Sequence, residues 1–205
     1  MSEAAKVYIV DDDASMRESL RFLFEAQDVE AEFFSGAREF LAAGGAAKSG
    51  CLVADVRMPE MNGLELQQEL AKNGSRLAVI LMTGHGDVPM AVSAMRAGAF
   101  DFIEKPFADD ALLDSVRRAL EQAGKRRQTA GEHPAEAADV ARRLALLTPR
   151  EREVLDHLVR GSPHKVIAHA LEISPRTIEV HRARIMQKME ARNLAELVRL
   201  MLTGG

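Results

Sequence analysis

Side chains suited to phosphate chemistry follow four short apolar runs in the first half of the sequence. The runs occupy 7–10, 51–54, 77–82 and 100–103, and the side chains that follow them are Asp11, Asp12, Asp55, Thr83 and Lys105. Carboxylates bind hard cations, and an aspartate can also attack phosphorus. If the runs are parallel strands, these side chains converge at the carboxyl edge of one sheet, where open α/β folds bind their ligands.

The three aspartates predict a cation site. Asp11, Asp12 and Asp55 bring negative charges together, which is costly unless a cation or a shared proton neutralises them. Mg²⁺ takes one or two carboxylates, keeps several waters and accepts phosphate oxygens. We expect Asp12 and Asp55 to be direct ligands and Asp11 to act through water. A backbone carbonyl near Arg57 would complete the set.

Asp55 is the predicted phosphoryl acceptor. In phosphoryl transfer the protein mainly supplies positive charge and donors to the equatorial oxygens, which the Lys105 ammonium, the Thr83 hydroxyl and Mg²⁺ would do here. Two other interpretations compete with this one. The acidic residues after the first strand could merely cap a helix, and a phosphatase could use Asp55 with a second aspartate two residues later. That position holds Arg57, which argues against turnover.

The first half of the chain alternates between strands and helices. A further apolar run at 29–34 makes five expected strands, and amphipathic segments separate or follow them at 14–26, 35–43, 62–73, 88–97 and 109–122. Parallel neighbours need helical crossovers, so this alternation predicts a doubly wound, five-stranded parallel sheet of the flavodoxin-like kind. Nearly all-apolar strands agree with a sheet that is covered on both faces.

The charge distribution favours two domains. Residues 1–124 carry a net charge of −9 and residues 125–205 a net charge of +5. An acidic half joined to a basic half suggests cation or phosphate chemistry in the first and a polyanionic partner for the second. We predict a phosphoacceptor domain at 1–124, a partly helical linker at 125–147 and an all-α domain at 148–205.

The last segment predicts four short helices that include a helix-turn-helix. Thr148 with Glu151 forms a capping box, and Ser-Pro pairs at 162–163 and 174–175 mark further helix starts. The segment 165–171, a short turn and the helix 175–190 form the motif. On the second helix of this motif, 175–190, the apolar side chains at 178, 185 and 189 share one face, which we expect to be buried.

The opposite face of that helix could enter a major groove. Glu179 could accept a hydrogen bond from a cytosine amino group, Val180 could touch a thymine methyl, and the small Ala183 would permit close approach. Arg176 lies on this face too, and the side chains better placed for phosphates are Lys165, Thr177, Arg184 and Lys188. A solvated basic face is the competing interpretation.

The motifs together resemble a known family over nearly the whole chain. Segments 10–13, 55–63, 82–84 and 105–107 resemble the receiver domain of two-component response regulators, and 147–155, 165–168 and 173–181 resemble the LuxR-type DNA-binding domain. The run 83–90 and the domain order are similar to regulators of the FixJ type, which control nitrogen-fixation genes. Where Glu179 stands, LuxR-type domains often have a basic residue, so the base preference stays open.

The resemblance implies a phosphorylation switch rather than an enzyme. A FixL-like sensor histidine kinase would phosphorylate Asp55, Thr83 would shift toward the phosphate, and Phe102 would turn inward. Phosphorylated chains would pair through a face that includes Val92 and Arg96, bind promoter DNA and activate transcription with RNA polymerase.

A second kind of function remains open from sequence alone, namely a receiver joined to a helical protein-binding module that never touches DNA. The histidine spacings match no zinc motif. No apolar stretch approaches the roughly 20 residues needed to span a bilayer, so we expect no membrane contact and a cytoplasmic location.

Overall fold

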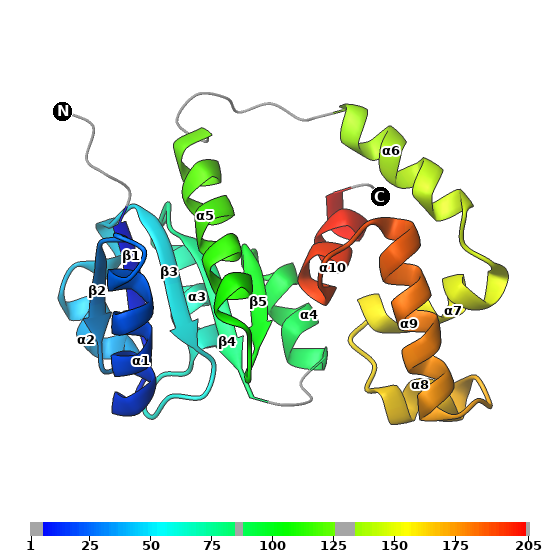
Figure 1. Ribbon diagram of the computed structural model, residues 1–205, viewed down its shortest axis with the longest axis horizontal. Coiled ribbons are helices and arrows are strands. Elements are labelled where there is room, and N and C mark those ends of the chain that lie inside the picture. The colour runs from blue at the N-terminus through cyan, green and yellow to red at the C-terminus, as the bar shows by residue number, and fades with distance from the viewer. Residues whose placement is uncertain (1–5, 85–87, 126–133, 204–205) are drawn as a thin grey trace. The chain divides into compact units, whose positions relative to one another are not determined.

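The computed structural model describes residues 6–84, 88–125 and 134–203. Its contacts divide the chain into two compact units, one formed by 1–85 with 97–130 and the other by 86–96 with 131–205 (Figure 1). The first unit is an α/β domain and the second is entirely helical where it is described.

The first unit contains a five-stranded parallel sheet in the order β2-β1-β3-β4-β5. The strands are β1 (Lys6–Val10), β2 (Ala31–Phe34), β3 (Gly50–Asp55), β4 (Ala78–Thr83) and β5 (Asp101–Glu104). Every residue of β3 and β4 is buried, as expected for central parallel strands covered on both faces. The predicted doubly wound sheet is confirmed.

Helices cover both faces of this sheet. They are α1 (Ala14–Glu25), α2 (Ala37–Ala42), α3 (Gly63–Lys72) and α5 (Asp109–Lys125), with a 3₁₀ turn at Gly45–Ala47. Side chains of α1 and α5 pack with Val7 and Ile9 in one hydrophobic core. Tyr8 points to the other face because strand side chains alternate, and there its ring contacts Phe40 of α2 at a centroid distance of 5.8 Å.

The second unit contains the helices α4 (Val88–Arg96), α6 (Pro134–Ala145), α7 (Pro149–Val159), α8 (His164–Ala170), α9 (Pro175–Met189) and α10 (Leu194–Thr203). The capping box at Thr148 and Glu151 starts α7, and the Ser174 side chain caps α9. Helices α7 and α8 both pack on α9. Glu172, in the turn between α8 and α9, has a φ of 53°, a left-handed conformation that reverses the chain sharply.

The predicted helices of the last 58 residues are confirmed, and α6 supplies the predicted helical part of the linker. The predicted strand at 29–34 is shorter in the structure because β2 pairs only with β1, beginning where Val7 lies opposite Ala31. Residues 126–133, which belong to the predicted linker, lie outside the described residues.

Candidate functional site

The strand register brings the predicted acidic pocket together. Val10 lies opposite Ala54 across the β1–β3 pair, so Asp11 and Asp55 end adjacent strands side by side. Thr83, the last residue of β4, lies opposite Glu104, the last residue of β5, so Lys105 follows directly after that strand. Asp11, Asp55 and Thr83 are all buried.

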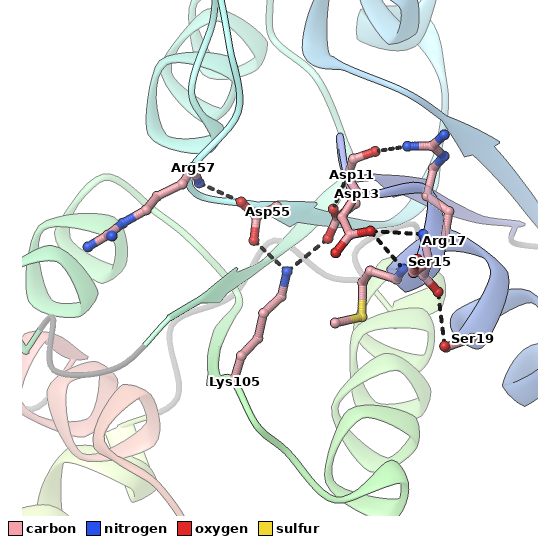
Figure 2. Close-up of polar contacts among 9 residues, drawn as sticks. Asp11, Asp13, Ser15, Arg17, Ser19, Asp55, Arg57 and Lys105 are labelled. Atoms are coloured by element: carbon pink, nitrogen blue, oxygen red, sulfur yellow. Dashed lines mark hydrogen bonds and ion pairs between the residues drawn. The ribbon is translucent and has the colours of Figure 1, made fainter.

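The Lys105 ammonium lies between two carboxylates, as Figure 2 shows. Its Nζ is 2.9 Å from Asp11 Oδ2 and 2.6 Å from Asp55 Oδ1. The second oxygen of Asp55 accepts a hydrogen bond from the backbone N–H of Arg57 at 2.6 Å. Asp11 Oδ1 accepts one from the backbone N–H of Asp13 at 2.9 Å. The protein therefore fixes the orientation of both carboxylates.

The backbone packs tightly behind Asp55. A Cβ atom at Gly63 would lie 2.4 Å from the carbonyl oxygen of Asp55, so only glycine fits at the start of α3. The Gly63 N–H donates to the Val56 carbonyl at 3.0 Å. The close packing and this hydrogen bond hold the loop after β3 against the end of that strand.

Burial and charge shift the titration of this pocket. Burial raises the pKa of Asp55 above its usual value, against the opposing effect of the Lys105 ammonium, and the neighbouring Asp11 raises it further. For Lys105, burial lowers the pKa, but hydrogen bonds and charge from Asp55 and Asp11 outweigh it and leave the pKa raised. Lys105 is therefore fully protonated at neutral pH.

The donor set fits Mg²⁺. Asp11 and Asp55 present hard carboxylate oxygens toward one point that already favours positive charge, and Mg²⁺ needs only one or two carboxylates. Among residues 6–84, 88–125 and 134–203, no three acidic, histidine or cysteine side chains lie close enough to surround an ion. Water and phosphate oxygens would supply the remaining positions. Receiver domains generally bind Mg²⁺ at this site.

The three consecutive aspartates have different environments. Asp11 is buried and faces Asp55, whereas Asp12 is exposed. Asp13 caps α1, because its Oδ1 accepts from the N–H groups of Ser15 and Met16. The capping interpretation therefore holds for Asp13 alone. The structure gives Asp11 the closer approach to the acceptor, and the assignment of Asp12 as a direct ligand stays a prediction.

The predicted switch residues occupy the neighbouring strands. The Thr83 hydroxyl donates to the Gly84 carbonyl at 3.3 Å, a long hydrogen bond that is easily exchanged. Phe102 on β5 is half-buried.

The residues predicted for the dimer face lie on α4. Val92 is buried, and Arg96 donates to the Val159 carbonyl at 3.2 Å within the second unit. The switch and dimer roles of these residues stay predictions.

The recognition helix α9 has the two faces that the sequence predicts. Ile178, Ile185 and Met189 are fully buried. The exposed side chains are Arg176, Glu179, Val180, Ala183, Arg184 and Gln187. Thr177 is half-buried, and its Oγ1 lies 2.8 Å from the Ser174 hydroxyl at the start of the helix. Lys165 of α8 is exposed.

Two further predicted DNA contacts, Glu179 and Lys188, have partners within the protein. Glu179 Oε1 lies 2.7 Å from His164 Nδ1. Lys188 Nζ lies 2.7 Å from Glu151 Oε2 and donates to the Leu146 carbonyl at 3.1 Å. A phosphate must therefore compete with Glu151 for the Lys188 ammonium. The sequence indicates Glu151 only as a helix cap and gives no sign of the contact between His164 and Glu179, because neither contact follows a fixed spacing.

A pH-dependent loss of stability follows from the environment of Glu151. The Lys188 hydrogen bond, followed by that from the Thr148 backbone N–H, lowers the pKa of Glu151 to about 2. Its contribution is complete above the ordinary pKa of 4.5 and is lost as the pH falls toward 2. We expect Glu151→Gln to lower the free energy of unfolding by about 1–3 kcal/mol at neutral pH, and the difference to shrink in acid. Urea unfolding at several pH values measures this.

The exposed Glu153 on the same helix provides the control. Glu153→Gln should change stability by less than about 0.5 kcal/mol at every pH. Equal effects of the two substitutions would contradict the assignment of Glu151.

Within the described part of the chain, no helix is long and apolar enough to cross a membrane.

Comparisons with known proteins match one family model to each half of the chain. The model of the response regulator receiver domain matches residues 7–117, and that of the bacterial regulatory proteins of the luxR family matches 145–201. The FixJ proteins of Bradyrhizobium diazoefficiens and Azorhizobium caulinodans are 46% and 48% identical over 205 residues, covering 100% of this chain and 98% and 95% of theirs. The crystal structure of full-length FixJ from B. japonicum matches with a TM-score of 0.56 and 46% identity, over 100% of this chain and 98% of that one.

These matches do not favour a protein-binding module in place of the DNA-binding domain. Together with the aspartate pocket and the helix-turn-helix, they show that the chain belongs to the FixJ-type response regulators, transcriptional regulators that join a receiver domain to a LuxR-type DNA-binding domain.

Proposed function

We propose that a sensor histidine kinase phosphorylates Asp55, and that the phosphorylated chain dimerises on promoter DNA and activates transcription with RNA polymerase. The observation that carries the proposal is the position of Lys105 Nζ between Asp11 and Asp55. This arrangement places an ammonium beside the carboxylate oxygen where a phosphoryl group would be held. The FixJ relatives support nitrogen-fixation or microaerobic genes as targets.

The chemistry assigns a role to each side chain. A carboxylate oxygen of Asp55 attacks phosphorus and forms a P–O bond while the P–N bond of the phosphohistidine donor breaks and the imidazole leaves. Lys105 donates hydrogen bonds to the phosphoryl oxygens, and the Thr83 hydroxyl turns from the Gly84 carbonyl toward them. Mg²⁺, when bound, neutralises charge on the transferring group. We assign its site to Asp11, Asp55 and the Arg57 carbonyl, and to Asp12 once its exposed side chain turns toward them. Apart from accepting the phosphoryl group, the domain would catalyse at most its own slow dephosphorylation.

Phosphorylation of Asp55 must change the surface through which two chains pair. We propose that movement of Thr83 lets Phe102 turn inward and remodels the face that includes Val92 and Arg96. Arg96 must first release the Val159 carbonyl before it can meet a second chain. The domain boundaries that we propose are 1–124 for the receiver, 125–147 for the linker and 148–205 for the DNA-binding domain.

DNA binding divides into two kinds of contact. We propose that Lys165, Arg176, Thr177, Arg184 and Lys188 bind phosphates, and that Glu179, Val180 and Ala183 face the bases. Phosphate contacts release counterions, so affinity falls steeply with salt. The side chains proposed to contact DNA lie on the accessible side of α8 and α9. Lys188 is the exception, because its ammonium forms an ion pair with Glu151.

The test combines sedimentation with a salt titration of the acetyl-phosphate-treated chain on duplex DNA. We expect a dimer at micromolar concentration. Four basic contacts in each chain predict a slope of log affinity against log salt of about −7. Arg184→Ala should reduce the slope by about 2, whereas Arg142→Ala, on the linker helix α6, should leave it unchanged. A phosphorylated species that stays monomeric, or a flat salt response, would contradict the proposal.

A further inference from the structure

A histidine from α8 holds the one acidic side chain on the exposed face of the recognition helix. His164 Nδ1 lies 2.7 Å from Glu179 Oε1, a short distance for a nitrogen–oxygen hydrogen bond. The Glu179 side chain is still 54% exposed. One carboxylate oxygen is therefore fixed from within the protein while the group as a whole remains open to a ligand.

The second carboxylate oxygen has only a distant partner. Arg182 NH1 lies 3.7 Å from Glu179 Oε2, which is too long for a hydrogen bond. Arg182 follows Glu179 by three residues, so the two side chains share one side of the helix. If His164 did not hold the carboxylate, a closer pairing with Arg182 would draw it along the helix surface.

The chemistry of the pair determines which ring nitrogen carries the proton. An ionised carboxylate can only accept hydrogen bonds, so Nδ1 of His164 must be the donor. Nε2 of the same ring is buried, with no hydrogen-bond partner among the residues that the structure describes. The ring therefore reaches a partner through Nδ1, and this contact orients the Glu179 carboxylate.

We infer that His164 is a positioning residue for base recognition, and that it orients Glu179 to accept a hydrogen bond from the amino group of cytosine. The inference rests on the proposed placement of α9 in the major groove, where cytosine presents that amino donor. Fixing the carboxylate before DNA arrives removes the entropy cost of ordering it on binding. His164 thus contributes to selectivity without touching a base.

The test uses the acetyl-phosphate-treated full chain and a library of randomised DNA duplexes. Selection with the unmodified chain and with Glu179→Gln identifies the base pair at which their preferences differ. Glutamine reads adenine, so the preference there should change from cytosine to adenine. Affinities are then measured on four duplexes that differ only at that base pair. The unmodified chain should prefer cytosine by about tenfold.

Three further variants isolate the contribution of His164. His164→Ala should reduce the preference for cytosine roughly two- to tenfold at that base pair, with the salt dependence unchanged. His164→Gln retains an N–H donor and should restore most of the preference. His169→Ala, which removes an exposed imidazole from the same helix, should have no effect. Thermal unfolding of each variant identifies any loss of fold.

The outcomes separate this inference from the proposal on which it rests. If Glu179→Gln changes the preference but His164→Ala behaves like His169→Ala, or weakens binding to all four duplexes equally, the positioning role is overturned. If Glu179→Gln changes the preference at no base pair, the proposed base contact fails and the inference fails with it.

Discussion

Asp55→Asn should reduce phosphorylation by acetyl phosphate to background and leave the protein folded. The amide cannot act as the nucleophile, although it keeps the size of the side chain and can still accept the Arg57 N–H. Lys105 would retain Asp11 as a partner at 2.9 Å, so the free energy of unfolding should change by no more than about 1–2 kcal/mol. Radiolabelling and thermal unfolding measure the two effects.

Loss of phosphorylation should also remove the gain in DNA affinity. With acetyl phosphate present, Asp55→Asn should bind DNA no more tightly than the untreated chain. Asp109→Asn, at the exposed start of α5, is the matched control and should label normally. Labelling of Asp55→Asn at the level of the control would remove Asp55 from the mechanism.

Lys105→Met should destabilise the receiver domain and make it depend on Mg²⁺. The substitution leaves the buried carboxylates of Asp11 and Asp55 facing each other without the ammonium, which we expect to cost about 2 kcal/mol or more. Without the ammonium, burial and the Asp11 charge raise the pKa of Asp55 further, so the lost stability should return as the pH falls and Asp55 binds a proton. Mg²⁺ should raise the unfolding free energy of the variant more than that of the unmodified chain. Urea unfolding with and without Mg²⁺ measures both effects.

Lys72 offers a matched control, because its side chain is 73% exposed and contacts Glu69 only at 3.7 Å. Lys72→Met should unfold like the unmodified chain at every pH and Mg²⁺ concentration. If Lys105→Met did the same, the ammonium would not be what stabilises the paired carboxylates.

The architecture of the receiver follows from features that a sequence shows directly. Long apolar runs such as 77–82 can be buried only as central strands, and the helices between them impose parallel neighbours. Parallel strands place their carboxyl ends at one edge, which is why the meeting of Asp11, Asp55 and Lys105 could be predicted without coordinates. The buried stripe of α9 followed in the same way from the helical period.

The partners of individual polar side chains could not be predicted. Which of three consecutive aspartates points into the pocket depends on the backbone turn after β1, and the structure selects Asp11. The buried Asp101 accepts from the Ser115 hydroxyl at 2.6 Å and from Arg118 at 2.8 Å, contacts that join β5 to α5. The pairing of His164 with Glu179 likewise joins two helices. Such contacts depend on how elements pack, which no local pattern records.

The position of the phosphoryl group tests the central claim most directly. The chain is treated with acetyl phosphate and Mg²⁺, the acyl phosphate is reduced with borohydride, and the modified residue is located by peptide mass spectrometry. We predict a single modified residue, Asp55, beside the ammonium that lies 2.6 Å from its carboxylate. A modification at Asp11, Asp12 or any other residue, with Asp55 unchanged, would contradict the account.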